Sequence, residues 1–103
     1  MTKYEIWFVS LDPTIGSEIQ KTRPCVIISP KELDYLQTRI VAPITSKGFN
    51  APYRMEFELL GKNAKILCDQ IRSISTQRFV SKIGELDNKN SEKLSEILTS
   101  MFK

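Results

Sequence analysis

Side chains that could take part in catalysis or bind an anion are concentrated in residues 12–23, DPTIGSEIQKTR. This segment lies between two apolar stretches. It contains the charged residues Asp12, Glu18, Lys21 and Arg23. A connection this long inside a small domain is usually functional or disordered. The guanidinium of an arginine presents a rigid fork of N–H donors that suits the charged oxygens of a phosphoryl group. The residues alone favour a simpler alternative, a strand-edge Arg23 paired with Glu18, and leave the phosphoryl role open.

The residue types that are missing exclude several kinds of catalysis. The chain has no histidine, which rules out a histidine general base, a Ser/His/Asp triad and a histidine-bearing zinc site. Two cysteines, Cys25 and Cys68, are too few for a zinc site of four thiolates. Because both lie in apolar strings (PCVII and KILCD), we expect free, buried and reduced thiols, and hence a cytoplasmic protein.

Length and charge predict one small domain over residues 1–103. A chain of 103 residues with 41% hydrophobic and 26% charged side chains buries roughly 65% of its unfolded surface and supports one core. Fifteen basic against twelve acidic residues give a net charge of +3, which permits an anionic partner without requiring one. The first residues lack the order of a signal peptide, and no apolar run is long enough to span a bilayer, so we expect no membrane contact.

Hydrophobic patterning predicts short strands joined by turns. We expect strands at 4–11, 24–29, 39–45, 54–59 and 79–86, with two strand-like pieces in 65–74 separated by Asp69 and Gln70. The apolar run at 24–29 is typical of a central strand buried on both faces. Pro43 favours an edge, a bulge or a strand end, Pro30 favours one helical turn within 30–38, and GKNA at 61–64 predicts a tight turn.

A C-terminal helix is indicated by apolar residues at helical spacing. These residues are Leu94, Ile97, Leu98, Met101 and Phe102. Asn88 or Asn90 is the expected N-cap. Strands followed by one helix favour a small, strongly bent sheet or barrel. Since one helix cannot cover both faces of such a sheet, we also expect a homodimer that hides the second face.

Three blocks of the chain resemble the MazF/PemK (Kid) family of toxin endoribonucleases. They are LDPTIGSEIQKTRPCVIIS at 11–29, VAPIT at 41–45 and LCDQIRSISTQRF at 67–79, followed by the helix. The resemblance implies an SH3-like, partly open barrel, mainly β with a C-terminal helix, that forms a homodimer. It further implies that the protein cleaves single-stranded RNA, such as mRNA, without a metal or other cofactor. In this reaction a 2′-hydroxyl of the RNA itself attacks the phosphate. The expected products are a 2′,3′-cyclic phosphate and a 5′-hydroxyl. A cognate antitoxin would place its C-terminal segment in the RNA groove.

The same resemblance assigns roles to individual residues. Arg23 and Thr45 match the catalytic positions, and Pro24 restricts Arg23 to extended backbone. The residues expected to bind RNA or support the site are Ser17, Glu18, Ser46, Asp69 and Gln70. Some relatives carry histidine where this chain has Ser17. One branch carries a catalytic arginine where this chain has Leu67, so more of the charge stabilisation falls to Arg23.

Structural alternatives stand beside these roles. Thr45 could satisfy only its own strand end, and Asp69 could brace Arg72 or cap a turn. Trp7 and Phe8 suit a core or dimer contact better than base stacking. Phe49, in a polar turn, is expected to be exposed and free to stack on a base or contact the antitoxin.

Two other functions remain compatible with the sequence. Toxins of the same fold inhibit DNA gyrase by binding it, without any cleavage. A bare SH3-like interaction module that has lost its activity is the third interpretation.

Overall fold

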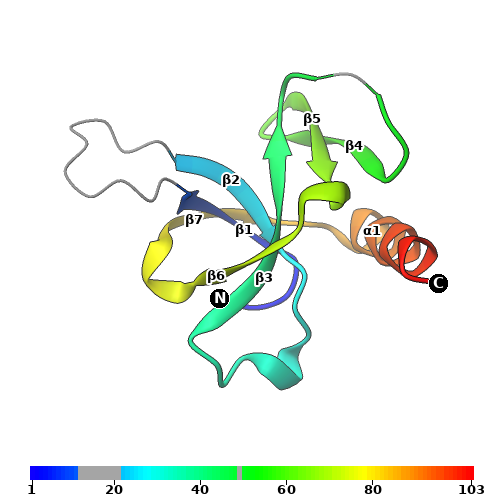
Figure 1. The fold of residues 1–103 in the computed structure, drawn as a ribbon. Coiled ribbons are helices and arrows are strands. Elements are labelled where there is room, and N and C mark those ends of the chain that lie inside the picture. The colour runs from blue at the N-terminus through cyan, green and yellow to red at the C-terminus, as the bar shows by residue number, and fades with distance from the viewer. Residues whose placement is uncertain (12–21, 49) are drawn as a thin grey trace.

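The computed structural model describes residues 1–11, 22–48 and 50–103, which form a curled antiparallel sheet and one C-terminal helix (Figure 1). The strands are β1 (Glu5–Ser10), β2 (Thr22–Ile27), β3 (Thr38–Thr45), β4 (Arg54–Leu59), β5 (Lys62–Leu67), β6 (Arg72–Ser75) and β7 (Phe79–Glu85), and the helix is α1 (Asn88–Met101). The 3₁₀ turn at Lys31–Leu33 confirms the helical turn predicted after Pro30. The one at Cys68–Gln70, between β5 and β6, confirms the break predicted at Asp69 and Gln70.

The sheet is organised around β3. One side of β3 pairs with β2, from Cys25↔Pro43 to Ile27↔Val41. On the other side its residues 38–41 pair with β6, and residues 44–45 pair with β5. Pro43 lies at this change of partner strand, an irregular position of the kind that its missing N–H predicts. The strand order is β4-β5-β3-β2-β1-β7, with β6 beside β3.

The edge strands β4 and β7 curl towards each other and make the sheet a partly open barrel, which confirms the predicted fold class. A cavity of about 190 Å³ is lined by residues 57–59 of β4 and 83–85 of β7. Leu59 and Ile83 pack against the same buried cluster. The buried members of this main core are Ile6, Val26, Ala42, Ile44, Met55, Phe57, Ala64, Ile66, Cys68, Leu86 and Leu94.

Helix α1 packs against this core through the predicted stripe, with corrections at both ends. Leu94 is fully buried, and three half-buried residues pack beside it: Ile97, Leu98 and Met101. Phe102 is wrongly predicted to pack: it follows the last helical residue and is 69% exposed. The N-cap is Asp87, not Asn88 or Asn90, because its Oδ1 accepts the backbone N–H of Asn90 at 2.8 Å, and a carboxylate also suits the positive end of the helix dipole. Within the described ranges no helix is both long and apolar enough to cross a bilayer.

The chain itself buries a second apolar cluster on the other face of the sheet. The dimer therefore stays a prediction that does not depend on the need to cover that face. A second cluster contains Val9, Cys25, Ile27, Val41, Ile74 and Phe79, all at most 9% exposed. It forms because β6 pairs with β3 and β7 pairs with β1, so the curled sheet brings residues of five strands together. Val26 belongs to the main core and its neighbours Cys25 and Ile27 to the second cluster, so β2 is buried on both faces, as predicted.

The β4–β5 hairpin is tighter than GKNA predicts. Leu60 (φ 52°) and Gly61 (φ 79°) form its two-residue turn, and two successive left-handed residues match the right-handed twist of a hairpin. Lys62, Asn63 and Ala64 already belong to β5. The alternation predicted for 54–59 is present: Met55 and Phe57 are buried, whereas Glu56 and Glu58 are exposed.

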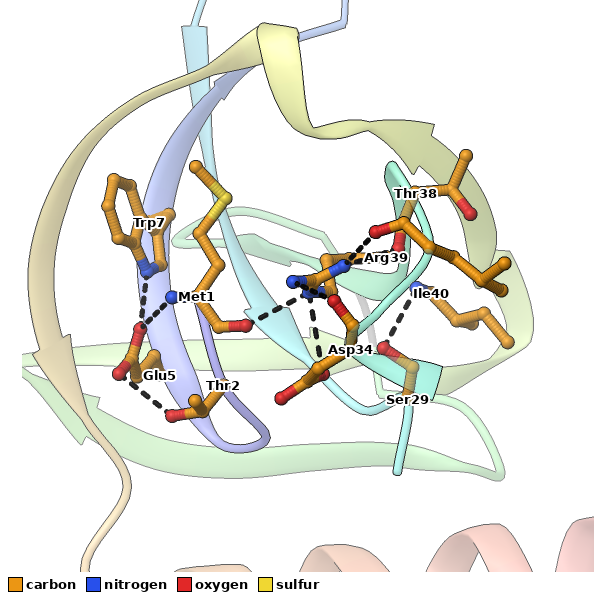
Figure 2. Close-up of polar contacts among 10 residues, drawn as sticks. Met1, Thr2, Glu5, Trp7, Ser29, Asp34, Thr38, Arg39 and Ile40 are labelled. Carbon is orange, nitrogen blue, oxygen red and sulfur yellow. Dashed lines mark hydrogen bonds and ion pairs between the residues drawn. The ribbon is translucent and has the colours of Figure 1, made fainter. Parts of the chain in front are cut away.

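Two polar networks fix the N-terminal segment (Figure 2). Glu5 accepts hydrogen bonds from Trp7 Nε1 at 2.9 Å and Thr2 Oγ1 at 2.8 Å. Arg39, a buried residue of β3, donates to the Met1 carbonyl at 2.9 Å. Burial by itself raises the pKa of Glu5, but the hydrogen bonds from Trp7 and Thr2 and the nearby N-terminal charge outweigh it and lower that pKa to about 2.

Replacing Glu5 with glutamine is expected to lower the free energy of unfolding at pH 7 by about 1 kcal/mol. A carboxylate with a lowered pKa stabilises the fold above its ordinary value of 4.5 and loses that contribution as pH falls towards 2. The difference between wild type and Glu5→Gln should therefore shrink from pH 4.5 to pH 2. Urea unfolding at several pH values measures it, and a difference that is constant across this window would contradict the assignment.

Candidate active site

A pocket of about 520 Å³ opens where β2 begins and β3 ends. Two of the residues that border it, Arg23 and Thr45, are the predicted catalytic pair. The other lining residues are Phe8, Pro24, Ile44, Ser46, Leu59, Leu60, Lys62, Asn63, Ala64 and Ile83. The structure thus brings Arg23, Thr45 and Ser46 to one cleft, with an apolar surface around them.

Strand register explains why Arg23 and Thr45 are neighbours. Cys25 of β2 pairs with Pro43 of β3, and continuing this antiparallel register by two residues sets Arg23 opposite Thr45. Opposite residues share a face of the sheet, with Cβ atoms about 4.5–5.5 Å apart. Arg23 is exposed and Thr45 half-buried, so a polymer can reach both.

The row continues beyond Thr45 across two more strands. Thr45 pairs with Lys65 of β5, and Lys65 pairs with Glu56 of β4. We call Arg23, Thr45, Lys65 and Glu56 the cross-strand row. A second pocket, of about 300 Å³, is lined by Lys65 and Glu56 and shares Ser46, Asn63 and Ala64 with the first. The row therefore presents a cation, a hydroxyl, a second cation and a carboxylate along one face.

The Thr45 hydroxyl is oriented by the turn that follows β3. Its Oγ1 accepts the backbone N–H of Lys47 at 3.1 Å. A hydroxyl carries one O–H donor besides its acceptor sites. Because the Lys47 N–H occupies an acceptor site of this oxygen, the O–H of Thr45 can donate a hydrogen bond to an oxygen of a bound phosphate.

Asp69 and Gln70 border neither of these two pockets. Asp69 forms a two-point ion pair with Arg54, whose Nε and a terminal nitrogen each lie 3.1 Å from a carboxylate oxygen. This hydrogen-bonded guanidinium lowers the pKa of Asp69. Of the alternatives for Asp69, the brace to Arg72 is wrong, because the ion-pair partner is Arg54, fifteen residues away in the sequence. Gln70 is exposed in the 3₁₀ turn after β5.

Three predicted residues, Ser17, Glu18 and Phe49, lie outside the described residues. Of the remaining aromatic candidates, Trp7 packs edge-on against Phe79 with ring centroids 5.8 Å apart. Trp7 therefore belongs to the packing of the second cluster, as the sequence favoured. Phe8 borders the pocket instead, a position that the strand pattern did not predict.

The cysteines take no visible part in the site. Both are free and buried, as predicted. Burial raises the pKa of Cys25 to about 12 and that of Cys68 to about 11, so both thiols are neutral near pH 7. Across residues 1–11, 22–48 and 50–103, no three His, Cys, Asp or Glu side chains gather as ligands of one metal ion.

Comparison with known proteins identifies the family. Residues 2–102 match the family described as "PemK-like, MazF-like toxin of type II toxin-antitoxin system". The chain belongs to this family. The resemblance to the MazF/PemK family that three sequence blocks indicated is thereby confirmed over nearly the whole chain.

Curated relatives and solved structures agree with this assignment. Endoribonuclease MazF9 of Mycobacterium tuberculosis is 32% identical over 109 residues, which cover 95% of this chain and 92% of the relative. Endoribonuclease PemK of Escherichia coli is 34% identical over 110 residues, covering 96% and 83%. A solved endoribonuclease in complex with its cognate antitoxin, from a mycobacterial species, superposes with a TM-score of 0.81 at 11% identity and covers 99% of this chain and 94% of its own. At that identity the superposition shows the fold.

The sequence pattern assigns Lys65 and Glu56 to strands and does not predict that they lie in one row with Thr45. The signal that could have found them is the register of the β4–β5 hairpin, which a two-residue turn at Leu60 and Gly61 sets. That register places Lys65 opposite Glu56. The pairing of Thr45 with Lys65 joins residues about twenty positions apart on β3 and β5, and no local turn predicts it.

Proposed function

We propose that this MazF-like chain is a sequence-specific endoribonuclease that cleaves single-stranded RNA, chiefly mRNA, as the toxin of a toxin–antitoxin pair. The observation that carries the proposal is the placement of Arg23 beside Thr45 on one pocket. Relatives over nearly the whole chain that are named endoribonucleases support it. Bases of a single strand can be splayed out and read, which a duplex does not allow.

The proposed reaction is an internal transfer within the RNA. The 2′-hydroxyl oxygen attacks the adjacent phosphorus, the bond to the 5′-oxygen breaks, and the chain ends as a 2′,3′-cyclic phosphate and a 5′-hydroxyl. The 2′-proton is lost and the leaving oxygen gains one, so the number of protons is unchanged. Arg23 offsets the charge that builds on the non-bridging oxygens, and Thr45 donates a hydrogen bond to one of them. Positioning and charge stabilisation by these groups require neither a metal nor an imidazole.

The proposal includes the assembly in which the toxin acts. With a net charge of only +3 per chain, a homodimer whose two copies share one groove binds RNA better than a single copy. An antitoxin segment that lies in this groove excludes RNA from it. A solved neighbour in complex with its cognate antitoxin supports such a partner. The free thiols favour a cytoplasmic location, where mRNA is present.

Cleavage in the presence of EDTA tests the proposed activity. We expect the purified protein to cut a long RNA at discrete sites, at the same rate with and without 10-fold excess EDTA over divalent ions. The rival function, inhibition of gyrase by binding, is tested in a parallel supercoiling assay. Intact RNA together with stalled gyrase would favour that rival, and intact RNA with active gyrase would favour an inactive interaction module.

A further inference from the structure

Lys65 lies directly beside the proposed catalytic hydroxyl. It is the β5 partner of Thr45, so the two side chains stand on one face about 5 Å apart at Cβ. Arg23 flanks Thr45 on the other side in the continued β2–β3 register. Adjacent strands are about 4.8 Å apart, which puts the two cations within side-chain reach of one phosphate bound over Thr45.

The ammonium group of Lys65 is already held near the site. Its Nζ donates to the Gly48 carbonyl at 3.2 Å, in the turn that follows Thr45. An ammonium carries three N–H donors. Among the described residues, one of these donors is used, in the hydrogen bond to Gly48. Lys65 lines the second pocket, which meets the first at Ser46, Asn63 and Ala64. Two donors are therefore available for an anion bound where the two pockets meet.

Lys65 shares its face of β5 with an apolar residue. Leu67 is 4% exposed and apolar. Residues two apart on a strand share a face, so Lys65 and Leu67 stand on the same face of β5. On this face of β5 the positive charge therefore stands at Lys65, directly opposite Thr45.

We propose that Lys65 is a second phosphate-binding cation of the site and contacts the scissile phosphate together with Arg23. This inference rests on the proposed endoribonuclease function. Lys65 stabilises charge that grows during the attack of the 2′-hydroxyl, so its removal acts mainly on kcat. Glu56, on the far side of Lys65 in the cross-strand row, opposes the approach of RNA through its negative charge.

The experiment compares Lys65→Gln with Glu56→Gln, and uses Lys93→Gln as the control. Lys93 is exposed on α1 and borders neither site pocket. We expect Lys65→Gln to lower kcat by roughly 10-fold to 100-fold, which is at or below the lower end of the loss of one transition-state donor. Each phosphate contact on single-stranded nucleic acid contributes about 0.7 to the slope of log affinity against log salt concentration, so the slope of kcat/KM should fall by about that amount. Glu56→Gln should raise kcat/KM by about 2-fold to 3-fold, and Lys93→Gln should change neither quantity.

The competing explanation is that Lys65 only ties down the turn at Gly48. In that case Lys65→Gln would lower the thermal unfolding midpoint and leave the salt slope of wild type unchanged, which would overturn the inference. A Lys65→Arg variant that restores at least half of kcat supports a charge contact over a purely structural tie. If wild type itself fails to cleave RNA, the proposed function is wrong; if wild type cleaves and Lys65→Gln matches it, only the role of Lys65 is wrong.

Discussion

Replacing Arg23 with alanine is expected to lower kcat for RNA cleavage by about 10²-fold to 10³-fold while leaving the fold intact. The guanidinium supplies donors that strengthen as charge develops on the phosphoryl oxygens, and an exposed residue at the start of β2 contributes little to packing. Single-turnover cleavage of one mapped RNA site measures the loss. Circular dichroism and the thermal unfolding midpoint report on the fold.

Matched variants separate charge from geometry at this pair. Arg23→Lys keeps the charge but loses the planar fork, so we expect it to recover only a small part of the activity. Thr45→Ser keeps the hydroxyl and should remain within about 10-fold of wild type, whereas Thr45→Val keeps the shape and should lose about as much as one oxyanion donor supplies. Activity at the wild-type level in Arg23→Ala would contradict the proposed mechanism.

Replacing Arg39 with methionine is expected to lower the free energy of unfolding by about 3–5 kcal/mol. The Arg39 guanidinium is 8% exposed and donates to four backbone carbonyls at 2.8–3.1 Å (Figure 2). These carbonyls belong to Met1, Leu36, Thr38 and Asp34. Asp34 Oδ1 is buried and its near neighbour is Arg39 Nε at 3.5 Å. Methionine fills similar space but leaves these acceptors without donors, and that cost is a large share of the stability of a small domain.

Thermal unfolding measures this loss. At about 4–8 °C per kcal/mol for a domain of this size, the midpoint should fall by at least about 12 °C. Arg39→Lys retains the charge and one or two of the hydrogen bonds, so its midpoint should lie between those of Arg39→Met and wild type. Arg39 borders neither site pocket, and the folded fraction should therefore keep its kcat. A midpoint within 3 °C of wild type would show that water or the chain satisfies these carbonyls.

Local chemistry made most of the fold predictable. The strands at 4–11, 54–59 and 79–86 follow from alternation and β-branched content, and the helix follows from its 3.6-residue stripe. Errors arose where a neighbour in space decided the outcome. Asp87 competes successfully with two asparagines for the helix start because its carboxylate carries charge. The second apolar cluster includes Ile74 of β6 and Phe79 of β7, and no local pattern reveals that these two strands join it.

The sequence predicts which residues belong to the site, but it does not predict which of them lie next to each other. Arg23 and Thr45 were identified by resemblance, and their neighbourhood depends on the pairing of β2 with β3. The Asp69 partner, Arg54, is fifteen residues away, and Lys65 reaches Thr45 only through β3–β5 pairing. Antiparallel register decides the two neighbours of Thr45, whereas Asp69 meets Arg54 from the 3₁₀ turn that follows β5. A single sequence contains no periodic signal for these contacts.

The chemistry of the cleaved ends tests the central claim most directly. An RNA containing one mapped cleavage site is incubated with wild-type protein in EDTA, alongside the same RNA with a single 2′-deoxyribose on the 5′ side of that site. We predict a 2′,3′-cyclic phosphate and a 5′-hydroxyl from the first RNA and no cut at this site in the second. Ends that carry a 3′-hydroxyl and a 5′-phosphate, or cleavage of the deoxy-substituted site, would contradict the account.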